Sequence, residues 1–174
     1  MLTRFSTAAV LIAAAIALGY LLAGIPNVEG MSAVIFLSGC LLGTGGGALV
    51  GALSIALFSV LNPLGPPLPP VLLAQIAGMS LIGVSGHLWR RLIPVTPRPE
   101  ILAAVLGALL TVIYGVLVDY GFATSMGRWK DPWPVIIAGI PFSIVHIISN
   151  AVIFFGVSLF AVRKYKLGAD GRRA

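Results

Sequence analysis

The stretch FLSGCLLGTGGGALVGALSIALFSVLNPLGPPLPP, residues 36–70, lies inside a longer segment, residues 30–86, that contains no charged side chain. A helix needs about 20 apolar residues to cross roughly 30 Å of hydrocarbon, so this segment is too long for one crossing. It is interrupted by GTGGG at 43–47 and by NPLGPPLPP at 62–70. We expect the glycines at 45–47 to form a cytoplasmic hairpin, because glycine can adopt positive φ. We expect the prolines to form a rigid turn, because each removes a backbone donor and clashes one turn back.

The composition of the whole chain is that of an integral membrane protein. Of 174 residues, 59% are hydrophobic and 9% are charged, and the mean hydropathy is +1.06, whereas soluble domains carry about 25% charged residues. The apolar runs lack the alternation over about 10 residues that marks β-barrel strands. We therefore predict an all-α polytopic membrane protein, a single domain over residues 1–174 with six transmembrane helices in one bundle. The predicted spans are 5–24, 31–44, 46–61, 70–91, 100–122 and 134–163.

Cationic residues are distributed unevenly between the two sides that six spans define. The side with the termini receives Arg4, Arg90, Arg91, Arg98, Arg163, Lys164, Lys166, Arg172 and Arg173, and the other side receives Arg128 and Lys130. Cytoplasmic segments carry an excess of Lys and Arg, so both termini are predicted to be cytoplasmic. The net charge of +6 then reflects topology, and it does not indicate a nucleic-acid partner. For the basic tail at 163–173, contact with the lipid bilayer and simple solvation both remain open.

Two polar side chains lie deep in the last apolar run, in FSIVHIISN at 142–150. His146 is twelve residues beyond a helix start near 134, which places it about 18 Å into the membrane. Asn150 follows four residues later and shares its helix face. Lipid disfavours polar groups at this depth, so the face should point into the bundle or into a cavity.

Three interpretations of this face remain open from the residues alone. His146 and Asn150 could be structural, each bonded to a neighbouring helix. They could be catalytic, because Phe142, His146 and Asn150 fit Phe-x-x-x-His and His-x-x-x-Asn elements that resemble intramembrane proteases of the CAAX-processing class. Those enzymes also need a paired glutamate motif, and this chain offers only Glu29 and Glu100.

The third interpretation is a ligand cavity that opens outward, with an apolar lining and a few placed polar groups. Its aromatic walls would be Tyr120, Trp129 and Trp133, and its polar anchors would be Glu29, Asp119, His146 and Asn150.

Other chemistries are not indicated. GTGGG lacks the lysine of a phosphate-binding loop, so any ATP hydrolysis must occur in another polypeptide. Two histidines and one cysteine do not make a metal site, and we expect no metal, no cofactor and no enzymatic activity.

The order of several features resembles the substrate-binding S components of energy-coupling factor (ECF) transporters, the prokaryotic vitamin importers. These features are an alanine-spaced first helix, IPNVEG at 25–30, the stretch at 36–70, LLAQIAGM at 72–79 and HIISN at 146–150, and the likeness runs over about residues 8–163. The resemblance implies a six-helix bundle in the cell membrane that binds a vitamin or a related small heterocycle from outside. It also implies three partners, a membrane coupling subunit and two cytoplasmic ATPases. An intramembrane enzyme and a ligand-free scaffold are the alternatives.

The resemblance also assigns roles to residues. The alanine motif that docks on the coupling subunit maps onto Ala9, Ala13 and Ala17, although small residues at this spacing could equally pack inside the bundle. The loop that covers the substrate maps onto Asn27 and Glu29. The remaining substrate contacts map loosely onto Gln75, Asp119, Tyr120, Trp129, Trp133, His146 and Asn150. These anchors suit thiamine-like, pyridoxine-like and flavin-like compounds alike.

Overall fold

The computed structural model describes residues 2–62 and 65–170, with side chains described for 3–62 and 65–164. These ranges form five helices and no strand: α1 (Leu2–Leu22), α2 (Met31–Val60), α3 (Pro69–Leu92), α4 (Pro99–Ser125) and α5 (Trp133–Asp170). All five are long and apolar enough to cross a membrane, which confirms an all-helical, multi-pass membrane protein. Among the residues used for the orientation, Arg172, Arg173 and the side chain of Lys166 lie outside the described part.

The largest difference from the predicted spans lies in α2. The sequence predicts two spans, 31–44 and 46–61, with a hairpin at the glycines 45–47. In the structure, residues 44–60 are helical and the break lies at Gly43. Its φ of 86° and ψ of −178° are non-helical. A single residue in this conformation is sufficient to redirect the helix, and glycine adopts it at low cost.

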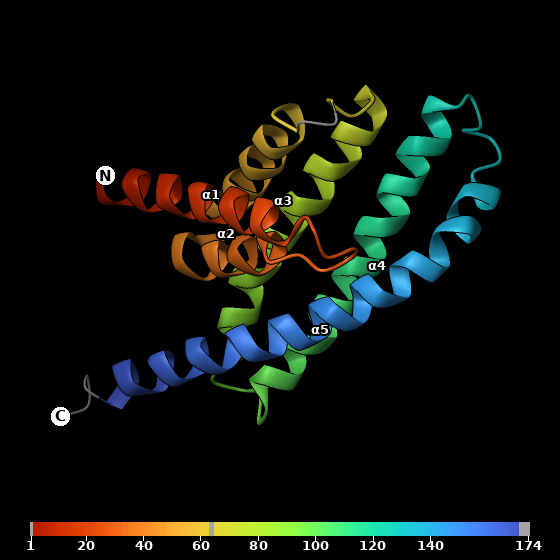
Figure 1. The fold of residues 1–174 in the computed structure, drawn as a ribbon. Coiled ribbons are helices and arrows are strands. Elements are labelled where there is room, and N and C mark those ends of the chain that lie inside the picture. Colours follow the sequence, from red (N-terminus) through yellow and green to blue (C-terminus); the bar gives the residue numbers. More distant parts are fainter. Residues whose placement is uncertain (1, 63–64, 171–174) are drawn as a thin grey trace.

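The two halves of α2 fold back on each other at this break (Figure 1). A β-carbon on Gly47 would lie 2.6 Å from the α-carbon of Gly39, whereas eight residues of straight helix span about 12 Å. Both ends of α2 therefore reach the last turns of α1. Gly30, just before α2, packs against Leu18, and the Tyr20 hydroxyl donates to the carbonyl of Leu61 at 3.2 Å.

The closest helix contact joins α2 to α3 through residues without side chains. β-Carbons on Gly47 and Gly83 would each collide with the backbone of the other helix, and one on Gly51 would collide with the carbonyl of Met79. Small residues let two backbones approach in lipid, where van der Waals contact replaces the hydrophobic drive. α3 itself begins at Pro69 and Pro70, as expected for prolines in a first turn, where the missing donor has no cost.

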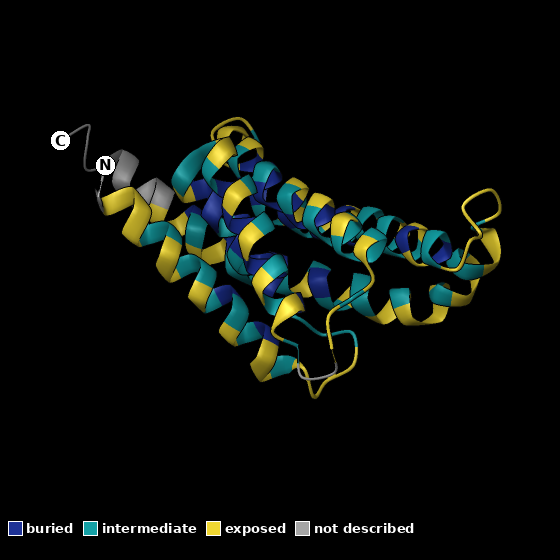
Figure 2. Ribbon diagram, turned by 90° about the horizontal axis from the view of Figure 1, so that it is seen from above, coloured by how far each residue is buried: buried dark blue, intermediate teal, exposed yellow. Residues whose placement is uncertain are grey.

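The start of α1 and the end of α5 lie at the same end of the molecule (Figures 1 and 2). At this terminus end, Trp89 Nε1 donates to the carbonyl of Pro99 at 2.8 Å, and the Arg90 guanidinium donates to the carbonyl of Cys40. The α2–α3 and α4–α5 connections lie toward the opposite end, and the loop 23–30 lies beside the middle of α5, where Asn27 contacts Ser149 (Figure 1). α1 packs against α2 alone among the helices, so its remaining faces are open.

Candidate functional site

A cavity of about 240 Å³ lies beneath the loop 23–30. Its walls come from the end of α1, this loop, both ends of α2, and one position each on α3 and α4. Gly19, Met31 and Phe58 contribute apolar or small surfaces, and the polar lining consists of Asn27, Glu29, Gln75 and Tyr114. The cavity therefore combines an apolar wall with a few polar groups from separate elements, as small-molecule sites do.

Glu29 provides the only charged side chain among the lining residues. Its Oε1 lies 3.4 Å from Nε2 of His146, and the two side chains are 26% and 18% exposed. No described residue forms a hydrogen bond with this buried nitrogen, so Glu29 is its nearest polar partner. His146 does not line the cavity, but it contacts two residues that do, Glu29 and Tyr114. Its ring is edge-on to that of Tyr114, with 6.4 Å between the ring centroids.

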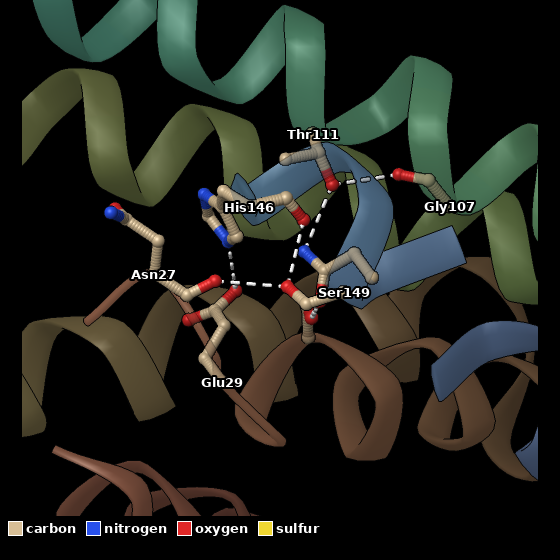
Figure 3. Close-up of polar contacts among 8 residues, drawn as sticks. Asn27, Glu29, Gly107, Thr111, His146 and Ser149 are labelled. Atoms are coloured by element: carbon tan, nitrogen blue, oxygen red, sulfur yellow. Dashed lines mark hydrogen bonds and ion pairs between the residues drawn. The ribbon is translucent and has the colours of Figure 1, made fainter. Parts of the chain in front are cut away.

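The loop over the cavity is fixed to α5 by its backbone. The hydroxyl of Ser149 donates to the carbonyl of Asn27 at 2.9 Å (Figure 3). Asn27 adopts a positive φ of 59°, which asparagine tolerates better than most residues. The side chain of Asn27 points away from this contact (Figure 3), and the residue lines the cavity.

Gln75 reaches the cavity from the first turns of α3. Its side-chain oxygen accepts a hydrogen bond from the hydroxyl of Ser59 on α2 at 3.0 Å. Tyr114 on α4 lines the same cavity as Gln75 and Glu29. Three helices and the covering loop thus bring polar groups together at one place.

Asn150 takes no part in this cavity. It is 1% exposed, its Nδ2 donates to Thr111 Oγ1 at 2.9 Å, and its Oδ1 accepts from Ser32 Oγ at 3.3 Å. The carboxamide therefore joins α2, α4 and α5 as a structural hydrogen-bonding group. The expectation that His146 and Asn150 both face a hollow is met by neither residue: His146 is not among the residues that line the cavity, and the Asn150 amide is hydrogen-bonded on both sides.

Thr111 and Tyr114 on α4 were not singled out from the sequence, although a signal was present. They lie three residues apart in the otherwise apolar stretch 101–118 of α4, just as His146 and Asn150 lie four apart in α5. The two pairs meet across the antiparallel helices, Thr111 with Asn150 and Tyr114 with His146. Polar side chains at matching depth in neighbouring helices could have indicated this pairing.

The other predicted site residues lie outside the cavity. Asp119 packs between α4 and α5, where a β-carbon on Gly139 would lie 2.7 Å from its Oδ2. Tyr120, Trp129 and Trp133 are 46%, 55% and 65% exposed. Lys130 Nζ lies 4.9 Å from the ring centre of Trp129. This group surrounds the α4–α5 connection, and its aromatic residues have the exposure of membrane-interface anchors.

The two glutamates lie in different parts of the fold. Of the two glutamates, Glu29 lies by His146 while Glu100 is in the first turn of α4, at the terminus end. The described part of the chain therefore places no paired carboxylates beside His146. It also contains no group of three His, Cys, Asp or Glu side chains able to hold a metal ion.

Comparison with known proteins identifies the family of this chain. Residues 4–158 match the family described as "ECF transporter, substrate-specific component". No curated protein and no solved structure gives a significant match. The match covers most of the chain and includes every residue that lines the cavity. The protein belongs to the substrate-specific components of ECF transporters.

Proposed function

We propose that this chain captures a small heterocyclic micronutrient in the cavity beneath the loop 23–30 and delivers it to an ATP-driven importer. Members of the family bind small molecules and work with a membrane coupling component and ATPases. The observation that carries the proposal is the cavity itself, whose polar lining comes from the covering loop, α3 and α4. With the termini cytoplasmic, the cavity opens toward the outside of a prokaryotic cell membrane.

The size and charge of the cavity limit the cargo. Its volume of about 240 Å³ is slightly below the range of about 300–1,000 Å³ that encloses drug-sized ligands. A molecule of the size of thiamine or pyridoxine therefore suits it better than a flavin. Glu29 is the only charged lining residue, so we propose a cargo that is cationic or rich in hydrogen-bond donors.

Two positions at the end of α1 allow a matched test. Ala23 is exposed and lines the cavity, whereas Gly24 is exposed, has open space around its α-carbon and does not line it. Native mass spectrometry of the purified protein first identifies the co-purified small molecule, and thiamine, pyridoxine and riboflavin are then titrated in parallel. We expect Ala23→Trp to weaken binding of the retained compound at least about tenfold and Gly24→Trp to leave it unchanged. Equal affinities in both variants would contradict a cargo site at this cavity.

The coupling face is proposed on α1. Ala9, Ala13 and Ala17 are exposed, while Ala15 is fully buried against the bundle. Because α1 contacts only α2, the exposed alanines leave a flat face on which another helix can pack closely. We expect Ala13→Leu to reduce co-purification of the coupling subunit without changing cargo affinity. Val105→Leu, at an exposed position on α4, is the control that should leave both unchanged.

A further inference from the structure

A second hollow, of about 520 Å³, lies at the terminus end and is larger than the cargo cavity. It runs between the first half of α2, the end of α3 and the last part of α5, and we call it the basic groove. Leu41, Ile93 and Phe160 provide apolar walls, Trp89 provides a buried wall, and Arg90 and Lys164 provide two cations. None of the lining residues is acidic.

The two cations are available for an anion. Among residues with described side chains, neither Arg90 nor Lys164 forms an ion pair with an acidic group. Arg90 uses its guanidinium to contact the carbonyl of Cys40. That carbonyl precedes the break at Gly43, where helical carbonyls lose intrahelical partners. This contact holds the Arg90 side chain beside the groove, and a guanidinium has five N–H donors, so capacity remains for a second acceptor.

The apolar walls open toward the lipid. Leu41 is 59% exposed and Phe160 is 78% exposed, while Trp89 is anchored by its hydrogen bond to Pro99. A ligand that fits this groove therefore has an anionic group that contacts Arg90 and Lys164. It also has an apolar chain that packs along Leu41 and Phe160. A phospholipid has this combination, and basic pockets between helices are typical sites for anionic lipid headgroups.

We propose that the basic groove binds one anionic phospholipid, with its phosphate between Arg90 and Lys164 and an acyl chain along the apolar walls. This site is separate from the cargo cavity and does not depend on the identity of the cargo. The lipid completes the surface of the bundle where α5 diverges from the first half of α2.

Neighbouring cations provide the control. Arg91 and Arg163 are exposed at the same end of the molecule but do not line the groove. The full chain is purified in mild detergent and mixed with equal amounts of phosphatidylglycerol and phosphatidylcholine that carry identical acyl chains. Native mass spectrometry then measures how much of each lipid the protein retains. We expect the parent to prefer phosphatidylglycerol, and Arg90→Gln with Lys164→Gln to reduce its retention roughly 5-fold for each cation and about 30-fold together.

Arg91→Gln with Arg163→Gln should leave the preference unchanged. Ala161→Leu, which narrows the groove without altering charge, should lower retention of both lipids, and it keeps the proposal testable if Arg90→Gln fails to fold. Equal retention of the two lipids by the parent, or equal losses in the two charge pairs, would overturn the proposal. It would also be overturned if the groove variants blocked assembly with the coupling subunit while lipid retention stayed constant, because the groove would then be a protein contact.

Discussion

Asn150 shows how much a single amide contributes to this bundle. Its two hydrogen bonds connect the first half of α2, through Ser32, to α4, through Thr111. Both bonds lie in the protein interior, where an unsatisfied polar partner costs about 1–3 kcal/mol. We therefore expect the residue to act on the stability of the bundle rather than on contact with cargo.

Asn150→Ala should lower the free energy of unfolding by about 1–2 kcal/mol, because it removes both bonds and leaves a void among the three helices. The measurement is the thermal unfolding midpoint in detergent, with Ser143→Ala as a control at a partly buried serine that bonds only within α5. An unchanged midpoint together with a large loss of cargo affinity would place Asn150 in the cargo site instead.

The sequence identified His146 and Asn150 as polar residues deep in an apolar helix. It did not show that Asn150 bonds neighbouring helices whereas His146 lies beside Glu29. The difference arises from what each side chain meets on other helices. Asn150 meets Ser32 and Thr111, whereas His146 meets Glu29 and Tyr114. Spacing along one helix contains no information about these partners, because they are set by how α4 and the loop 23–30 pack against α5.

At the scale of a helix, the bend in α2 has the strongest consequences. Four glycines occur within residues 43–47, and the sequence alone could not show which of them breaks the helix. Gly43 has positive φ, Gly45 is helical with open space around it, and Gly47 is helical and pressed against Gly83. The glycines thus serve different purposes, and only tertiary packing distinguishes them.

Gly43→Ala should destabilise the bundle by about 1–3 kcal/mol, because alanine is strained at this φ and ψ. Gly45→Ala is the matched control and should be neutral or stabilising by about 0.5–1 kcal/mol, since alanine favours a helix interior. Thermal unfolding of both variants in the same detergent makes the comparison. Similar midpoints for the two variants would mean that the bend does not depend on Gly43.

At the scale of the whole molecule, the two hollows have no lining residue in common. The cavity beneath the loop 23–30 is lined from α1, α2, α3 and α4, and the basic groove is lined from α2, the end of α3 and α5. Hydropathy predicted the membrane-spanning character and most helix bounds, because a helix that crosses the lipid needs a continuous run of apolar residues. It could not assign Tyr120, Trp129 and Trp133 to a role, because an aromatic residue near a helix end suits both a cargo site and the membrane interface.

The orientation in the membrane can be tested by cysteine labelling, since the only native thiol, Cys40, is buried. Met126 and Val95 are both well exposed and lie in connections at opposite ends. In intact cells, a membrane-impermeant maleimide should label Met126→Cys but label Val95→Cys only after permeabilisation. The reverse pattern would place the cargo cavity on the cytoplasmic side.

The central claim is that cargo binds beside Glu29, rather than near Asp119 at the α4–α5 connection. Equilibrium titration of the retained compound into Glu29→Gln and Asp119→Asn decides between these two acidic residues, because each substitution removes one charge and keeps the side-chain shape. We predict that Glu29→Gln weakens binding at least about tenfold, a loss of about 1.4 kcal/mol, while Asp119→Asn binds as the parent does. Parent-like affinity in Glu29→Gln with a tenfold loss in Asp119→Asn would contradict the account.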